Sequence, residues 1–158
     1  SNKVGRGLGK EDVVSGFAKA KLFGRFQAYK AKPLVILDGA HNTDGMNALV
    51  EEISSLKYGK CIVVFMCMAD KDYAAMLKQL KRIPRLNYVS FALMDTSRAA
   101  NRLLLGHAKK YFLAKVKKDV KVALRDAINS CGKNDLVLVC GSLYLLSTLL
   151  SKEPIITQ

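Results

Sequence analysis

The densest group of reactive side chains lies in residues 38–42, which read Asp-Gly-Ala-His-Asn and follow a short apolar run. Glycine permits a tight turn there, and the loop presents a carboxylate, an imidazole and an amide. These groups can hydrogen-bond a polar ligand or exchange a proton with it. Asp38 fits a turn or capping role equally well, because Asp is common in both. His41 gains little from packing at a polar loop position, which favours a role in binding.

A second candidate is Gly141-Ser142, which separates an apolar run from a helical pattern. Backbone N–H groups at the start of a helix can bind an anion, and the Ser142 hydroxyl can donate a hydrogen bond. A simple helix-capping serine explains the same residues, and without a family to compare it is slightly favoured. The loops at residues 69–72 and 95–98 also carry charged side chains, and caps followed by solvated side chains explain them equally well.

Several common site motifs are missing from the sequence. No GxGxxG follows the first apolar run, and no GxxxxGK[ST] occurs, so the chain lacks the usual loops for dinucleotides and triphosphates. The glycine-rich run at residues 5–10 has the wrong spacing. The four cysteines form no CxxC pair and are not spaced with His41 or His107 like a zinc site. We therefore expect no metal site in this chain and interpret the cysteines as buried, reduced thiols.

These loops must be positioned by elements that alternate between two periods. Continuous apolar runs predict buried strands, and apolar residues at i, i+3, i+4 and i+7 predict helices. Strands are predicted at residues 34–38, 61–68, 88–94 and 136–140, with a weaker one at 113–116, and helices at 46–56, 73–80, 99–112, 119–131 (Asp119 as N-cap, Gly132 as C-cap) and 143–150. Continuous apolar strands alternating with helices indicate an α/β fold with a parallel sheet covered on both faces. Ligands of such sheets bind beyond the carboxyl ends of the strands, so the four loops should share one rim.

The first thirty residues differ from this pattern. Residues 11–20 predict a short helix, and residues 26–30 predict a strand whose short link to the next one makes it an antiparallel edge strand. We expect residues 1–10 to be a flexible segment or the remnant of an interdomain linker, and residues 11–158 to form one domain.

Composition sets broad limits on the partners. A quarter of the residues are charged, half are apolar, and the formal net charge is +13. The excess favours anionic partners, but the lysines are scattered and no RNA-binding aromatic motif occurs, so nucleic acid is an unlikely partner. No segment has the length of a membrane span and the opening lacks a signal-peptide pattern, so the cytoplasm is the expected compartment.

Five motifs occur in an order that resembles one family. They are Gly24-Arg25-Phe26-Gln27, Leu37 to Asn42, Met68 to Asp72, Ser97-Arg98-Ala99 and Gly141-Ser142-Leu143-Tyr144. The series resembles the C-terminal domain of folylpolyglutamate synthases and dihydrofolate synthases, in the Mur ligase superfamily. The resemblance covers residues 11–150 and implies a Rossmann-like sheet of about six strands, mostly parallel with an antiparallel first strand.

The resemblance also implies a reaction. Members of the family use ATP and magnesium to join L-glutamate to a folate or to dihydropteroate through an acyl phosphate. Carried over by position, Arg25 resembles the arginine that reaches the ATP phosphates, Asp38 the carboxylate that binds the ribose, and Asn42 a residue shaping that loop. His41 and Ser142 resemble residues near the incoming glutamate. No role follows for Asp70, Lys71, Asp72, Ser97 or Arg98.

Two departures from the family pattern affect the expectation. Thr43 stands where the family usually has proline. The family's N-terminal ATPase domain, which carries the P-loop and the magnesium ligands, is absent from this sequence. We therefore expect this chain alone to have no ligase activity. Two alternatives remain open: a free-standing, non-catalytic domain or adaptor that binds a nucleotide or polyglutamate, and a basic nucleic-acid-binding module with a steep salt dependence.

Overall fold

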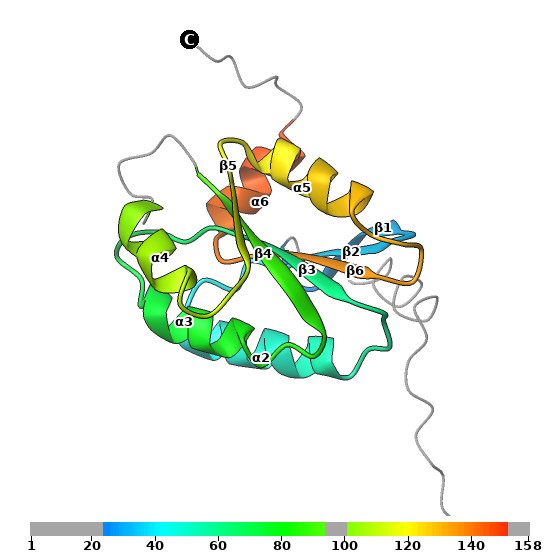
Figure 1. Cartoon of the computed structure of the whole chain (residues 1–158), viewed down its shortest axis with the longest axis horizontal. Helices are drawn as coiled ribbons and strands as arrows, with labels where there is room; N and C mark the ends of the chain where they lie inside the picture. Colours follow the sequence, from blue (N-terminus) through cyan, green and yellow to red (C-terminus); the bar gives the residue numbers. More distant parts are fainter. Residues whose placement is uncertain (1–23, 94–100, 152–158) are drawn as a thin grey trace, which may run out of the picture.

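The computed structural model describes residues 24–93 and 101–151, which form an α/β domain (Figure 1). Within these ranges six strands and five helices alternate along most of the chain. In order they are β1 (Gln27–Ala31), β2 (Leu34–Leu37), α2 (Thr43–Ser54), β3 (Cys61–Phe65), α3 (Tyr73–Leu80), β4 (Leu86–Ala92), α4 (Asn101–Ala108), β5 (Ala114–Lys117), α5 (Val120–Asn129), β6 (Leu136–Cys140) and α6 (Leu143–Leu150).

The strands form one six-stranded sheet in the order β1-β2-β6-β3-β4-β5. β1 pairs with β2 antiparallel, and the other neighbouring strands are parallel. The predicted sheet, with its antiparallel first edge strand, is therefore confirmed. Because β2 and β6 are neighbours, the loops that follow them leave the sheet side by side.

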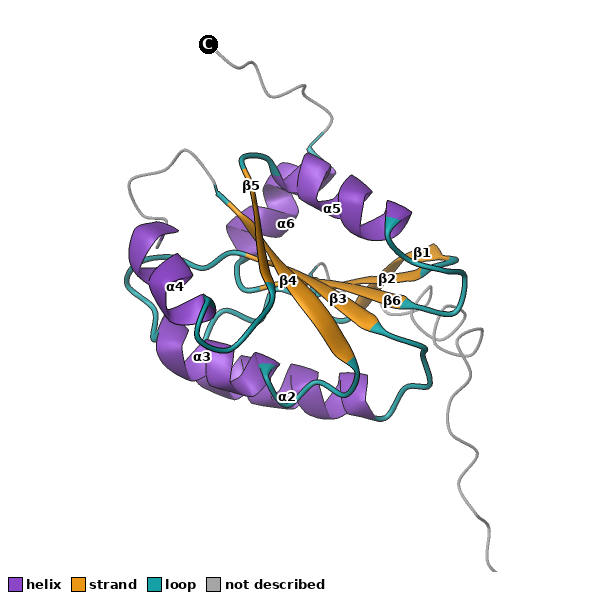
Figure 2. Ribbon diagram, viewed as in Figure 1, coloured by secondary structure: helices purple, strands orange, loops and turns teal. Residues whose placement is uncertain are grey.

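Helices cover both faces of the sheet (Figure 2). α2, α3 and α4 pack on one face, where their side chains join alternate residues of the strands in one apolar cluster. α5 and α6 pack on the other face and form a second cluster. The central strands β3 and β6 are buried along their whole length, which explains why their sequences read as continuous apolar runs.

Side-chain caps fix where four of the helices begin. Asn42, Asp72, Asp119 and Ser142 are N-caps whose side chains accept hydrogen bonds from backbone N–H groups of the first turn. Each cap follows a strand by a few residues, so it sets the shape of a loop at the carboxyl edge of the sheet.

Some predicted boundaries were wrong. β3 ends at Phe65, three residues early, and β4 runs from Leu86 to Ala92, where residues 88–94 were predicted. Gly132 is not the residue that ends α5, because Ser130 is the C-cap. The predictions for residues 1–10, for the helix at 11–20 and for Ser97 and Arg98 lie outside the described residues.

The structure can also be compared with the expectations of reduced, buried cysteines and of no membrane span. None of the four cysteines, all of which lie in described ranges, takes part in a disulfide, and Cys61, Cys67 and Cys140 are buried. Burial raises the pKa of the Cys67 thiol to about 12. In the described ranges, no helix combines the length and apolar character needed to cross a lipid bilayer.

Candidate functional site

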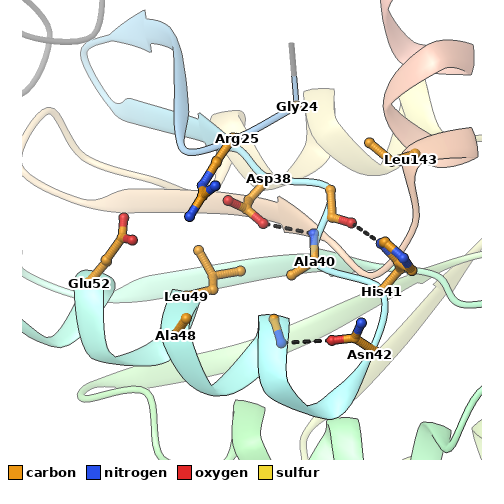
Figure 3. Close-up of a pocket in the computed structure, with 12 residues that line it drawn as sticks. Gly24, Arg25, Asp38, Ala40, His41, Asn42, Ala48, Leu49, Glu52 and Leu143 are labelled. Atoms are coloured by element: carbon orange, nitrogen blue, oxygen red, sulfur yellow. Dashed lines mark hydrogen bonds between the residues drawn. The ribbon is translucent and has the colours of Figure 1, made fainter. Parts of the chain in front are cut away.

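A cavity of about 240 Å³ lies at the carboxyl edge of the sheet, between the segment before β1, the loop after β2 and the start of α6 (Figure 3). It is lined by Gly24, Arg25, Asp38, Gly39, Ala40, His41, Asn42, Gly45, Ala48, Leu49, Glu52 and Leu143. Four of the five site residues predicted from the sequence therefore share one cavity. We call it the edge cavity.

Asp38 joins two of the walls of the edge cavity. Its Oδ2 accepts a hydrogen bond of 2.8 Å from the backbone N–H of Phe26, and its Oδ1 accepts one of 2.7 Å from that of Ala40. The side chain is nine-tenths buried. Asp38 thus holds the turn at Arg25 and Phe26 against its own loop, as a turn residue would, while part of the carboxylate reaches the cavity wall.

The turn that Asp38 holds has an unusual backbone. Phe26 has a φ of 43°, in the left-handed region that side chains other than glycine rarely adopt. Its ring is buried in the core, so the conformation fixes the aromatic side chain on one side and Arg25 on the other. Arg25 is exposed, and its guanidinium lies along the cavity, between Asp38 and Glu52 (Figure 3).

Opposing effects act on the protonation of Asp38. Burial raises the pKa of its carboxyl above the ordinary value, and the two backbone hydrogen bonds and the charge of Arg25 oppose that rise without cancelling it. The pKa of Glu52 is also raised, first by burial and then by the negative charge of Asp38. The two carboxylates and Arg25 therefore form one electrostatic unit.

His41 is exposed at the rim, and its orientation is set by its own loop. Its Nδ1 lies 2.8 Å from the carbonyl oxygen of Gly39. A carbonyl oxygen can only accept, so Nδ1 carries the proton in this hydrogen bond. In the neutral ring Nε2 is then left with a lone pair that can accept a proton.

Close packing of the loops explains two of the glycines. Gly39 lies so near the start of α6 that a Cβ there would come within 2.3 Å of Leu143 Cδ2. Gly141 has a φ of 109°, and a Cβ there would lie 2.1 Å from the carbonyl oxygen of Met66. Its N–H donates to the carbonyl oxygen of Ala40 at 3.0 Å. That N–H therefore fixes the loop after β2, and it does not face a ligand.

Ser142 does not line the edge cavity. It is 3% exposed, and its Oγ accepts a hydrogen bond of 3.1 Å from the N–H of Tyr144. The helix-capping interpretation describes its contacts. Asn42 combines both roles, since it lines the cavity while its Oδ1 accepts a hydrogen bond from Gly45 N at 2.7 Å.

The loop at residues 69–72 follows β3 at the carboxyl edge of the sheet, as expected, but it contributes no residue to the edge cavity. Asp72 caps α3 by accepting a hydrogen bond from Ala75 N, and Lys71 lies 4.0 Å from Asp70.

The helical wall of the edge cavity was missed by the sequence analysis. Gly45, Ala48, Leu49 and Glu52 line it from α2. Their spacing of three and four residues, starting one turn from the Asp38 loop, places them on one helix face. That spacing was visible in the sequence and could have identified Glu52 as a site residue.

The residues around the edge cavity offer cationic, anionic and amide groups to a polar ligand. Within the described residues, no group of three or more His, Cys, Asp or Glu side chains is arranged to hold a metal ion.

Comparison with known proteins gives one consistent answer. Residues 24–143 match the glutamate ligase domain of the Mur ligases. The chain is 32% identical over 141 residues to the dihydrofolate synthase/folylpolyglutamate synthase of Bacillus subtilis, covering 89% of the chain and 32% of that protein. It is 33% identical over 144 residues to a probable bifunctional folylpolyglutamate synthase/dihydropteroate synthase of Halobacterium salinarum, covering 89% of the chain and 17% of that protein.

Solved structures agree with these relatives. The Escherichia coli FolC structure in complex with ADP superimposes with a TM-score of 0.74 at 32% identity, covering 82% of this chain and 31% of that one. A folylpolyglutamate synthase of Mycobacterium tuberculosis shares the fold at 22% identity and a TM-score of 0.74, covering 89% of this chain and 35% of that one. The chain thus spans about a third or less of the length of these proteins.

Proposed function

The chain belongs to the glutamate ligase domain family of the Mur ligases, and from this premise we propose that it is the C-terminal domain of a longer ATP-dependent ligase that adds glutamate to folates. In the proposed reaction, a carboxylate of the pterin substrate attacks the γ-phosphorus of ATP, giving an acyl phosphate and ADP. The amine of L-glutamate then attacks the acyl carbon, phosphate leaves, and the amine loses a proton. The names of the similar proteins support this substrate class.

The observation that carries the proposal is the edge cavity itself. It unites Arg25, Asp38 and His41 at the carboxyl edge of the sheet, where α/β sheets bind ligands. A protein 32% identical to this chain has been solved with ADP. A cation for phosphates, a carboxylate for hydroxyl groups and a glycine-lined wall fit a nucleotide chemically.

Arg25 is the residue that we assign to the phosphates. It is exposed at the end of a turn that Asp38 holds by a buried hydrogen bond. A guanidinium on a fixed turn can reach a phosphate held by another domain and make charge-assisted hydrogen bonds to it. Neutralising charge on the transferring group lowers the barrier to phosphoryl transfer.

Asp38 is the residue that we assign to the ribose. Both of its oxygens already accept a backbone N–H, but an ionised carboxylate has about four lone-pair sites. A ribose hydroxyl can therefore donate to it without breaking either bond. The same residue would place the sugar and hold the turn that carries Arg25.

His41 and Ser142 are assigned to the glutamate step in different ways. His41 directs Nε2 outward because Nδ1 is held by the Gly39 carbonyl, so it can accept a proton from the attacking amine. Ser142 is buried and caps α6, so we assign it a positioning role through that helix. Asn42 shapes the end of the loop after β2 by capping α2.

The rest of the proposed site belongs to the family's N-terminal ATPase domain, which would supply the phosphate-binding loop and the magnesium ligands. Magnesium would neutralise negative charge on the phosphates of ATP. Both halves must close around ATP to exclude water and align the reactants. The isolated chain is therefore expected to be inactive.

Arg25→Ala in the longer ligase tests this assignment. A charge-assisted hydrogen bond contributes about 1.5–3 kcal/mol, so kcat/KM for ATP should fall roughly 10- to 150-fold. The control is Arg102→Ala, an exposed arginine of α4 that lies away from the edge cavity. Wild-type ATP kinetics in Arg25→Ala would refute the role of Arg25, and an equal loss in Arg102→Ala would show a nonspecific effect of charge and refute it as well.

A further inference from the structure

A second polar cavity of about 280 Å³ lies between β4, β5 and α5, on the opposite face of the sheet from α2. It is lined by Tyr88, Ser90, Lys115, Lys117, Asp126, Asn129 and Ser130. It shares no residue with the edge cavity, and the proposed function assigns it no role. We call it the β4–α5 cavity.

Two buried hydroxyl groups at this cavity have no hydrogen-bond partner among the described residues. Tyr88 and Ser90 are two positions apart on β4, so their side chains lie on the same face of the strand. They are only 4% and 2% exposed. In residues 24–93 and 101–151, neither hydroxyl makes a hydrogen bond. The large majority of buried side-chain polar atoms have a protein or water partner, so these two neighbouring hydroxyls are available to a partner beyond the described residues.

A lysine ammonium group lies beside these hydroxyls. Lys115 is the register partner of Ser90 across β4 and β5, and its Nζ lies 3.9 Å from the centroid of the Tyr88 ring. The contact holds the ammonium group over the ring by a cation–π attraction. Lys115 makes no ion pair within the described part of the chain.

The one carboxylate of the cavity is already neutralised. Asp126 Oδ2 lies 2.6 Å from Lys117 Nζ, and its Oδ1 lies 4.0 Å from Arg125 Nε. Lys115 also acts on Asp126 from a distance, but the cavity lining has two lysines for this one carboxylate and so keeps a surplus positive charge. The side chains that remain for a ligand are mainly hydrogen-bond donors: the Lys115 ammonium, the hydroxyls of Tyr88 and Ser90, and the Asn129 amide.

We propose that the β4–α5 cavity binds a small oxyanion, namely the carboxylate or phosphate group of a small metabolite, through Lys115, Tyr88 and Ser90. Donors and a surplus positive charge select an acceptor-rich anion. The volume lies just below the roughly 300–1,000 Å³ of cavities for drug-sized ligands, which favours a compact ligand over a nucleotide. This proposal does not rest on the ligase function.

Titration of the 158-residue chain by ¹H–¹⁵N NMR, with sodium phosphate in one arm and sodium glutarate in the other, tests the proposal. At least one anion should cause saturable shifts of the amides in residues 88–90, 115–117 and 126–130, and the arm that binds more tightly identifies the group. Sodium chloride at equal ionic strength should cause none. Shifts confined to residues 24–26 and 38–42, or no saturable shifts in either arm, would overturn the proposal and leave a cavity that holds only water.

Three substitutions assign the binding groups. Ser90→Ala and Tyr88→Phe each remove one hydroxyl with little change in shape and should weaken binding roughly fivefold. Lys115→Gln should weaken it roughly tenfold or more, because it removes the charge. Ser130→Ala is the matched control, since its hydroxyl already donates to the Asp126 carbonyl oxygen. Unchanged binding in both Ser90→Ala and Tyr88→Phe would contradict the assignment, whether or not Lys115→Gln remains folded.

Discussion

The role of Asp38 in holding the edge cavity can be tested by Asp38→Asn. The asparagine keeps the shape of the side chain but offers one acceptor oxygen in place of two. Either Phe26 N–H or Ala40 N–H, at 2.8 and 2.7 Å in the native protein, must then face an NH₂ group that cannot accept. Removing the negative charge alone would not have this effect, because a protonated carboxyl can still accept at both oxygens.

The magnitude follows from leaving one buried donor unsatisfied, which costs about 1–3 kcal/mol. That is a substantial part of a total stability of about 5–15 kcal/mol, but the variant should still fold. For a chain of this size the melting temperature should fall by roughly 2–12 °C. One of the two donors at risk belongs to Phe26, the residue with the left-handed backbone.

Urea unfolding followed by circular dichroism measures this cost, and Asp72→Asn is the matched control. Asp72 is also a loop aspartate, but it caps α3 through one hydrogen bond to Ala75 N, and asparagine caps helices equally well. The control should therefore unfold at nearly the wild-type urea concentration. If Asp38→Asn did the same, the two hydrogen bonds would not hold the loop, and the reasoning would be refuted.

The pH dependence of the unfolding free energy tests the same residue, Asp38, independently. Because the pKa of Asp38 is raised above 3.8 in the folded protein, the folded state binds the proton more tightly than the unfolded state. The contribution of Asp38 to the free energy of unfolding is therefore largest below pH 3.8 and decreases as the pH rises through the pKa that Asp38 has in the folded protein. The difference in unfolding free energy between wild type and Asp38→Asn should shrink over that window, and a difference that grows would contradict the raised pKa.

Two further predictions concern packing. Gly141→Ala should destabilise the chain by about 2–5 kcal/mol in urea unfolding, because it adds left-handed strain to a clash with the Met66 carbonyl oxygen. The control is Gly106→Ala, where a Cβ meets nothing within 4 Å, and it should stabilise α4 by about 0.5–1 kcal/mol. Equal changes in the free energy of unfolding of the two variants would contradict this account. Iodoacetamide at mildly alkaline pH should label the half-buried Cys131 faster than Cys61 or Cys140, because burial raises the pKa of the Cys61 and Cys140 thiols. Mass spectrometry of the labelled, folded protein measures the order, and labelling of Cys61 first would contradict the burial of Cys61.

Most of the fold could be predicted from the sequence because its signals are local. Continuous apolar runs such as that of β6 have no ambiguity of face, so they specify buried parallel strands, and the short link after residue 31 fixed the antiparallel edge strand. Strand ends were less certain. The apolar run of β3 continues to Met68, but the strand ends at Phe65. Met66 and Cys67 are buried although they lie outside the strand, so an apolar run alone does not mark where a strand ends.

The site was predicted less completely, because its contacts join distant residues. Five site residues were expected from the sequence, and the structure places four of them, Arg25, Asp38, His41 and Asn42, on one cavity. The fifth, Ser142, caps α6. The sequence could not show that both oxygens of Asp38 accept hydrogen bonds from backbone N–H groups, one of them on a residue twelve positions away. Glu52 was missed because an exposed glutamate on a helix resembles any solvated side chain, and its spacing from the Asp38 loop was not used.

The measurement that tests the central claim most directly is ATP-dependent incorporation of labelled L-glutamate by the longer ligase that we propose contains this chain, with folate or dihydropteroate as acceptor. The account predicts that incorporation requires both ATP and the acceptor, that one phosphate is released for each glutamate added, and that the 158-residue chain alone incorporates none. Failure to incorporate glutamate with either acceptor, in a protein that is folded and binds ATP, would contradict the proposed function.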